Sequence, residues 1–191
     1  KNIERLNKGK INLIIISTSK TLIKNFQQSE FKSKYFSMNA FERYICFLRN
    51  YGSLVRRIKK YLFFKNKFET FLYKNNIDLV YFTNPSAYSL YLEDTDFILT
   101  VPDVSHREEI EFPDWTKSQL GDFQRREEVL SKSTIRAIAV ITNAEIIKNR
   151  ISFFYSILKE RIYVISQRPS LSISKFEKIN EVTSQEFKKK Y

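Results

Sequence analysis

The sequence predicts an α/β fold of the Rossmann-like class, with a doubly wound parallel sheet and flanking helices. Apolar runs of strand length recur along the chain, and stretches with helical spacing of apolar residues separate them. This alternation favours a parallel sheet over an antiparallel one. The 191 residues suit one ordinary domain, and 42% apolar residues are enough to form a core. The expected strands are residues 11–16, 79–82, 97–101, 137–142 and 162–165.

Each expected element has a local signal. Residues 11–16 (INLIII) are typical of a strand buried on both faces. The hydroxyls of residues 17–19 then either bind a ligand or cap the next helix, and capping is the commoner role. Residues 40–74 have helical spacing and form one helix, or two that separate at Gly52, and residues 118–132 form a charged helix. Thr142 and Glu145 match a capping box at the start of a helix that contains Ile151 and Tyr155.

Composition limits the function classes. The 33 Lys and Arg against 21 Asp and Glu give a net charge of +12, which attracts nucleic acid or an anionic membrane surface. A single cysteine, Cys46, excludes an intramolecular disulfide and indicates a reducing compartment. Only three glycines are present, so the sequence contains no glycine-rich phosphate loop. It also contains no apolar run of membrane-spanning length and no signal peptide, which predicts a soluble or peripheral protein.

Residues 43–74 are strongly basic and rich in aromatic side chains. Lys and Arg next to Tyr and Phe suit an anionic membrane surface, where the cations reach the headgroups and the rings lie at headgroup depth. A solvated helix face over an aromatic core explains the same pattern equally well. The residues that we expect to face a membrane are Arg56, Arg57, Lys59 and Lys60.

Residues 78–113 contain two expected strands, each followed by a polar loop. The second strand ends at Pro102, and Asp103, His106 and Arg107 follow. Ligands of open α/β sheets lie beyond the carboxyl ends of the strands, so this position indicates a site. His106 is the only histidine and is either a general acid or base, a ligand for a sugar hydroxyl, or a structural residue. No Ser-His-Asp order and no metal-binding pattern accompany it.

Four segments together resemble the first domain of family 4 glycosyltransferases with the GT-B fold, in particular those of bacterial surface-polysaccharide and lipopolysaccharide assembly. The segments are TVPDVSHREEIEFPDW, GDFQRREEVL, AIAVITNAEIIKNRISFFY and ERIYVISQRPS, and the resemblance spans roughly residues 78–169. It implies that residues 1–170 are part of the N-terminal Rossmann-like domain. Residues 171–191 would then be a connector toward a C-terminal domain that this chain does not contain.

The resemblance implies a retaining glycosyltransferase that transfers a sugar from a nucleotide-sugar to a lipid-linked or polysaccharide acceptor. It implies catalytic roles for Asp103 and His106, and acceptor binding by Arg107, Glu111 and Arg126. The donor would be bound by the C-terminal domain without a metal or other cofactor, so we expect this chain alone to be incomplete and inactive. The expected location is the cytoplasm, peripheral at the inner face of the membrane.

Two other functions fit parts of the sequence. A nucleic-acid-binding module would use the basic, aromatic residues 43–74 to follow phosphates and stack bases. Residues 93–128, however, carry eleven acids against four bases, which argues against a nucleic-acid partner. The third interpretation is a non-catalytic Rossmann-like domain that binds a protein partner.

Overall fold

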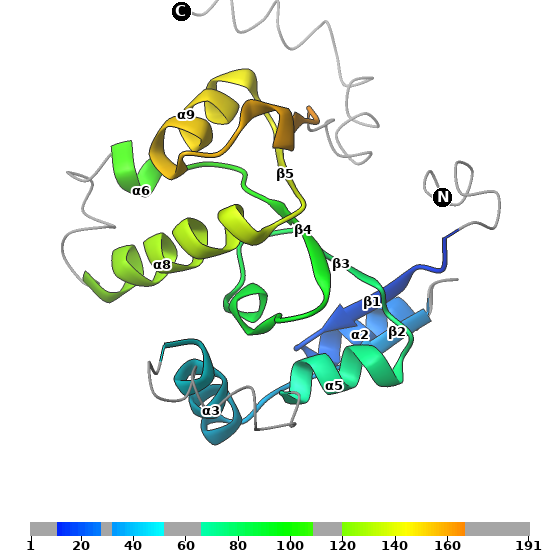
Figure 1. Cartoon of the computed structure of the whole chain (residues 1–191). Helices are drawn as coiled ribbons and strands as arrows, with labels where there is room; N and C mark the ends of the chain where they lie inside the picture. Colours follow the sequence, from blue (N-terminus) through cyan, green and yellow to red (C-terminus); the bar gives the residue numbers. More distant parts are fainter. Residues whose placement is uncertain (1–10, 28–31, 52–65, 109–119, 167–191) are drawn as a thin grey trace, which may run out of the picture. The chain divides into compact units, whose positions relative to one another are not determined.

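The computed structural model describes residues 11–27, 32–51, 66–108 and 120–166 (Figure 1). The chain divides into two compact units, residues 1–74 and residues 75–191. Both units are built from parallel strands with helices beside them, which confirms the predicted Rossmann-like α/β class. The predicted boundary at residue 170 and the basic residues Arg56, Arg57, Lys59 and Lys60 lie outside the described residues.

The first unit contains a two-stranded parallel sheet. Strand β1 (Ile14–Ser17) pairs with β2 (Lys32–Tyr35), and helix α2 (Lys20–Gln27) connects them. The predicted cap of α2 is confirmed, because the Leu22 amide donates to Ser19 Oγ at 3.4 Å. Strand β2 was not predicted, because its sequence KSKY contains no apolar run. In the structure three of its four residues are exposed.

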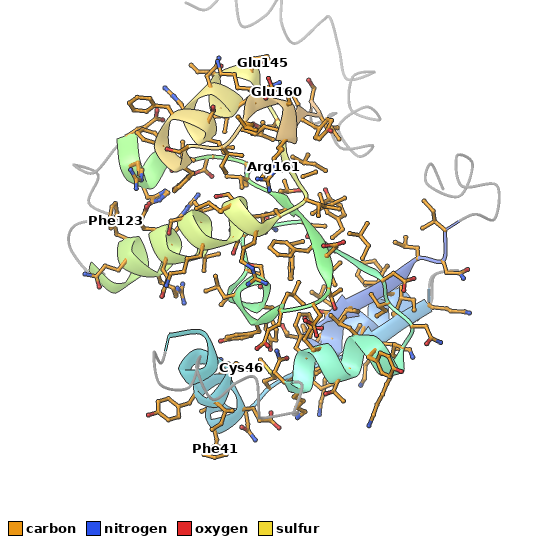
Figure 2. The ribbon with its side chains drawn as sticks, viewed as in Figure 1. Phe41, Cys46, Phe123, Glu145, Glu160 and Arg161 are labelled. Atoms are coloured by element: carbon orange, nitrogen blue, oxygen red, sulfur yellow. The ribbon has the colours of Figure 1, made fainter. Side chains whose placement is uncertain are left out.

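The predicted helical stretch 40–74 contains two helices, α3 (Ala40–Tyr51) and α5 (Lys67–Lys74). A capping box starts α3, because Asn39 and Glu42 each bind the other's backbone amide at 2.8 Å. Lys67 at the start of α5 forms an ion pair with Glu42 at 2.7 Å. Phe41 on α3 is 70% exposed, while Cys46 on the same helix is buried. Figure 2 labels both side chains.

The second unit contains a four-stranded parallel sheet in the order β3-β4-β5-β6. The strands are β3 (Leu79–Phe82), β4 (Asp96–Thr100), β5 (Ala139–Thr142) and β6 (Ile162–Val164), close to the predicted ranges. Phe97, Leu99, Val140 and Ile162 point to the buried side of the sheet and are at most 2% exposed. The alternating pattern of burial along β4 and β5 shows that one face of the sheet forms the core of this unit.

The connections in the second unit are mostly helical. A 3₁₀ helix, η1 (Ala87–Tyr91), joins β3 to β4, and α6 (Ser105–Glu108) and α8 (Leu120–Arg136) lie between β4 and β5. Helix α9 (Glu145–Tyr155) and the 3₁₀ helix η2 (Lys159–Arg161) lead to β6. Crossovers between parallel strands are right-handed, and the sequential strand order therefore places these connections on one face. Helix α8 contacts η1 and α9, consistent with that placement (Figure 1).

Polar contacts fix these connections to the sheet. The buried hydroxyls of Ser89 on η1 and Ser133 on α8 lie 2.6 Å apart. Arg161 on η2, labelled in Figure 2, donates to the backbone carbonyl of Ile135 in the last turn of α8 and to that of Ala137 just after the helix. The helix ends that approach the sheet are therefore held by hydrogen bonds as well as by apolar packing.

The predicted capping box of α9 is wrong. The residue before the helix is Ala144, whose backbone is extended and whose side chain makes no capping bond. Thr142 is instead the last residue of β5, where it pairs with Val164 and is 1% exposed. Its hydroxyl faces the buried side of the sheet, so it cannot reach the free amides of α9.

Candidate functional site

The candidate site begins where β4 ends. The Val101 amide donates to the Ile141 carbonyl at 2.8 Å, which continues the sheet pairing one residue past the strand. Val101 and Val104 are fully buried on either side of Pro102 and Asp103. The chain therefore leaves the carboxyl edge of the sheet in a fixed direction, and the polar residues that follow are positioned by the core.

The predicted polar loop after β4 contains the short helix α6. Asp103 starts this helix: its Oδ1 accepts hydrogen bonds from the Ser105 amide at 3.2 Å and the Ser105 hydroxyl at 2.7 Å. Arg126 on α8 reaches the same oxygen at 2.5 Å. Burial by itself would raise the pKa of Asp103, but the two bonds from Ser105 and the charge of Arg126 outweigh it and hold the pKa below its usual value.

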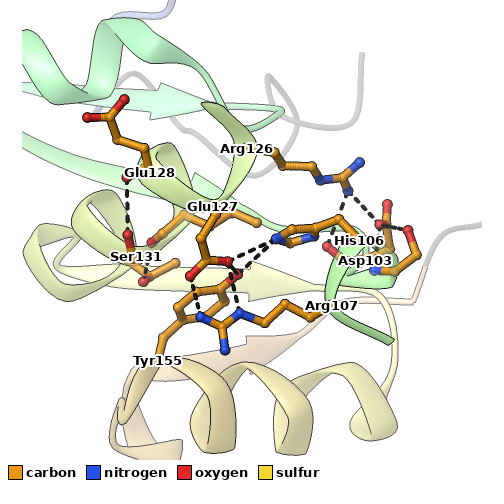
Figure 3. A network of polar contacts seen from close by, with 11 residues as sticks. Asp103, His106, Arg107, Arg126, Glu127, Glu128, Ser131 and Tyr155 are labelled. Carbon is orange, nitrogen blue, oxygen red and sulfur yellow. Dashed lines mark hydrogen bonds and ion pairs between the residues drawn. The ribbon is translucent and has the colours of Figure 1, made fainter. Parts of the chain in front are cut away.

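Glu127 on α8 is the centre of a second set of contacts, shown in Figure 3. Arg107 donates to it from two nitrogens, Nε to Oε2 at 2.8 Å and Nη2 to Oε1. His106 Nε2 lies 3.1 Å from Glu127 Oε2, and the Tyr155 hydroxyl donates to the same oxygen at 3.2 Å. The hydrogen bonds from Arg107 are the main cause that lowers the pKa of Glu127, although burial opposes them. Glu127 is therefore ionised at neutral pH.

His106 lies at the inner side of this network. Its side chain is fully buried, with the Phe123 ring centred 5.5 Å from the imidazole and the Tyr155 hydroxyl 3.4 Å from Nε2. Burial lowers the pKa of His106 most strongly, and the charges of Arg126 and Arg107 lower it further. The bond to Glu127 raises it but does not restore the ordinary value. His106 is therefore neutral near pH 7.

Helix α9 holds α6 from the other side. The Arg107 guanidinium lies 5.3 Å from the ring centres of both Phe154 and Tyr155, at the distance of a cation–π contact. Glu108 forms an ion pair with Arg150 of α9 at 2.5 Å. Burial is also the main cause that raises the pKa of Tyr155, so its hydroxyl keeps its proton. Two helices from distant parts of the sequence, α8 and α9, thus converge on His106, Arg107 and Glu108 of α6.

An open hollow of about 530 Å³ lies along α8 next to this network. Its lining combines one aromatic ring with acidic, basic, amide and hydroxyl side chains. These residues are Phe123, Gln124, Arg125, Glu127, Glu128, Ser131 and Lys132.

Four predicted site residues lie together in the structure: Asp103, His106, Arg107 and Arg126. The fifth, Glu111, lies outside the described residues. Sequence reasoning gave no site role to Glu127 or to Tyr155. Tyr155 follows Ile151 by four residues, so the sequence predicts that both lie on the buried face of the same helix. Nothing in that pattern indicates a polar role for the Tyr155 hydroxyl.

Comparisons with known proteins point to a glycosyltransferase structure. No protein-family model matches the chain, and no curated protein matches it. Among solved structures, the chain is similar to a glycosyltransferase from Rickettsia africae ESF-5, with 18% identity and a TM-score of 0.45. The alignment covers 98% of this chain and 43% of that one, so this chain spans less than half of its length. The α/β class of the chain rests on its own parallel sheets.

The described residues contain neither a candidate membrane span nor a candidate metal cluster. None of the helices in the described ranges is both long and apolar enough to cross a bilayer. Within the same ranges, no three His, Cys, Asp or Glu side chains are grouped so that they could hold a metal ion. The metal requirement of the reaction stays a prediction.

Proposed function

We propose that this chain is the acceptor-binding part of a retaining glycosyltransferase, which transfers a sugar from a nucleotide-sugar to a lipid-linked or polysaccharide acceptor. One observation carries the proposal. The motif residues Asp103, His106, Arg107 and Arg126 converge at the carboxyl edge of a parallel sheet, where α/β folds bind ligands. The segments that contain these residues are those that resemble the family 4 glycosyltransferases.

The exposure of the side chains suggests how the roles divide. The Asp103 side chain is 43% exposed and that of Arg107 is 33% exposed, so both can contact an acceptor at the surface. An ionised Asp103 is suited to accept a hydrogen bond from a sugar hydroxyl. His106 is fully buried, and its proposed catalytic role therefore requires that acceptor binding uncovers the ring. Arg126 keeps the Asp103 carboxylate in place and Glu111 completes the proposed acceptor contacts.

The remaining partners belong to the same proposal. The nucleotide-sugar would be bound by a second domain outside this chain, where helix ends and basic side chains neutralise its diphosphate. Docking to the anionic inner face of the membrane is supported by the net charge of +12. It is also supported by α3, whose Phe41, Tyr44 and Ile45 are exposed at helical spacing next to the exposed Arg43. In this proposal Arg56, Arg57, Lys59 and Lys60 face the same membrane.

The experiment is transfer of a labelled sugar by the intact gene product that contains this chain. Replacement of His106 by alanine should reduce transfer by about 10²-fold or more, the usual contribution of a general acid or base. The exposed Glu160, which lies on η2, provides the control variant Glu160→Gln, which should retain full transfer. Unfolding midpoints of both variants are measured in parallel, so that loss of folding is not mistaken for loss of chemistry. Transfer by His106→Ala equal to that of the control would refute the role of this site.

A further inference from the structure

The two nitrogens of a neutral histidine are chemically different, and the contacts of Glu127 determine which one carries the hydrogen. An ionised carboxylate only accepts hydrogen bonds. Glu127 Oε2 lies 3.1 Å from His106 Nε2, and the same oxygen accepts from Arg107 Nε and the Tyr155 hydroxyl. Because the bidentate contact with Arg107 keeps the carboxylate ionised, the Nε2 atom that faces it must be the donor. The lone pair of the neutral ring is then on Nδ1.

We propose that Glu127 is a positioning residue that holds His106 as the Nε2–H tautomer, so that Nδ1 is the ring atom that accepts a hydrogen bond from the acceptor hydroxyl. The part that concerns the acceptor rests on the proposed function. The part that concerns the tautomer depends only on the geometry between α6, α8 and α9. Histidine orientation by a carboxylate on the opposite ring nitrogen is a general device in proteins.

The charged groups around the ring support this assignment. Arg126 and Glu127 face it from α8, Arg107 faces it from α6, and the Tyr155 hydroxyl faces it from α9. The two arginines and the burial of the ring favour the neutral form, whereas Glu127 and the charge interaction with Asp103 favour the charged form. The ring is therefore neutral over most of the physiological pH range, and the position of its one hydrogen decides what it can do.

The chain contains one histidine, which makes the test direct. The chain is labelled with ¹⁵N-histidine, and the two ring nitrogen shifts are followed by NMR as the pH changes. We expect the Nε2–H tautomer in the wild-type chain, with a pKa below 6.5. In Glu127→Gln the pKa should fall further, because the group that favours the charged ring most strongly has lost its charge, and the tautomer should become mixed.

The control variant is Glu128→Gln, the adjacent glutamate, whose partner is Lys132 at 2.9 Å. It removes the same charge one residue away and should leave both the tautomer and the pKa of His106 unchanged. If Glu127→Gln instead exposed the ring to solvent, the pKa of His106 in that variant would rise toward 6.5, and this result would overturn the proposal. The Nδ1–H tautomer in the wild-type chain would overturn it as well, without the need for any variant.

The variant Tyr155→Phe tests whether Glu127 alone, or the hydrogen-bond network as a whole, determines the tautomer of His106. This variant removes a hydrogen-bond donor but keeps the Glu127 charge, so His106 should remain the Nε2–H tautomer. Loss of that tautomer in Tyr155→Phe would mean that the network as a whole, and not Glu127, fixes the ring, which contradicts the proposal. All these spectra are recorded without substrate. If the NMR spectra contradict the tautomer, the proposed function still stands. If His106→Ala transfers sugar normally, only the proposed contact between His106 Nδ1 and the acceptor is refuted.

Discussion

Tyr155→Phe should destabilise the chain by removing one hydrogen bond while leaving the packing of the ring almost unchanged. The Tyr155 hydroxyl donates to the ionised Glu127 at 3.2 Å, and the side chain is 5% exposed. Hydrogen bonds to charged groups contribute about 1.5–3 kcal/mol. The distance is long for an O–H donor, whose usual range is about 2.5–3.0 Å, so we expect the low end, about 1.5 kcal/mol.

Urea unfolding measures this loss. With a slope of about 1–3 kcal/mol/M for small proteins, the expected loss lowers the unfolding midpoint by about 0.5–1.5 M. The matched control is Tyr163→Phe on β6, because Tyr163 is 55% exposed and should change stability by less than about 0.5 kcal/mol. A double-mutant cycle with Glu127→Gln should give a coupling energy of about 1 kcal/mol. If Tyr155→Phe lost no more stability than the control, or if the coupling were zero, the hydrogen bond would contribute nothing and the reasoning would be wrong.

Two other predictions concern pH and the core. Acid should destabilise the chain, because the pKa values of His106, Glu127 and Asp103 are all lower in the folded chain than their ordinary values, so the unfolded chain binds protons more readily. Stability measured by urea unfolding should be highest above pH 6.5, fall first as His106 of the unfolded chain takes up a proton, and fall again below pH 4.5 as Glu127 of the unfolded chain takes up a proton. Unchanged stability between pH 7 and pH 4 would contradict this. Leu99→Ala in β4 should cost about 2–5 kcal/mol, since Leu99 is fully buried, whereas Leu158→Ala at a 69% exposed position should cost less than about 0.5 kcal/mol.

The strands that sequence reasoning found are those with continuous apolar runs. Residues 79–82 and 137–142 are buried on at least one face and read clearly as strands. Strand β2 was missed because KSKY has no apolar run, and its strand conformation comes from pairing with β1. The misplaced cap at Thr142 has a similar origin, because the motif was correct in spacing but the side chain points into the sheet. Local patterns identify elements, but tertiary contacts decide their exact ends.

The site was predictable only in part for the same reason. Asp103, His106 and Arg107 fall within a stretch of five positions that begins soon after a strand, so their grouping is visible in the sequence. Glu127 and Tyr155 lie 21 and 49 residues from His106, and nothing local marks them as its partners. Their roles arise because α8 and α9 return to the same end of the sheet, which a single sequence does not reveal.

Helix α6 shows how closely the site depends on these distant residues. Four residues make about one turn, and an isolated turn of helix is unstable in water because nucleation costs more than one hydrogen bond returns. The turn exists because Asp103 caps its start, Glu127 and the α9 rings hold Arg107, and Arg150 holds Glu108. Loss of any of these contacts would therefore release the helix together with the side chains that it carries. The polar network is thus the reason why His106 and Arg107 have defined positions, and a variant that weakens it should change the site before it changes the sheet.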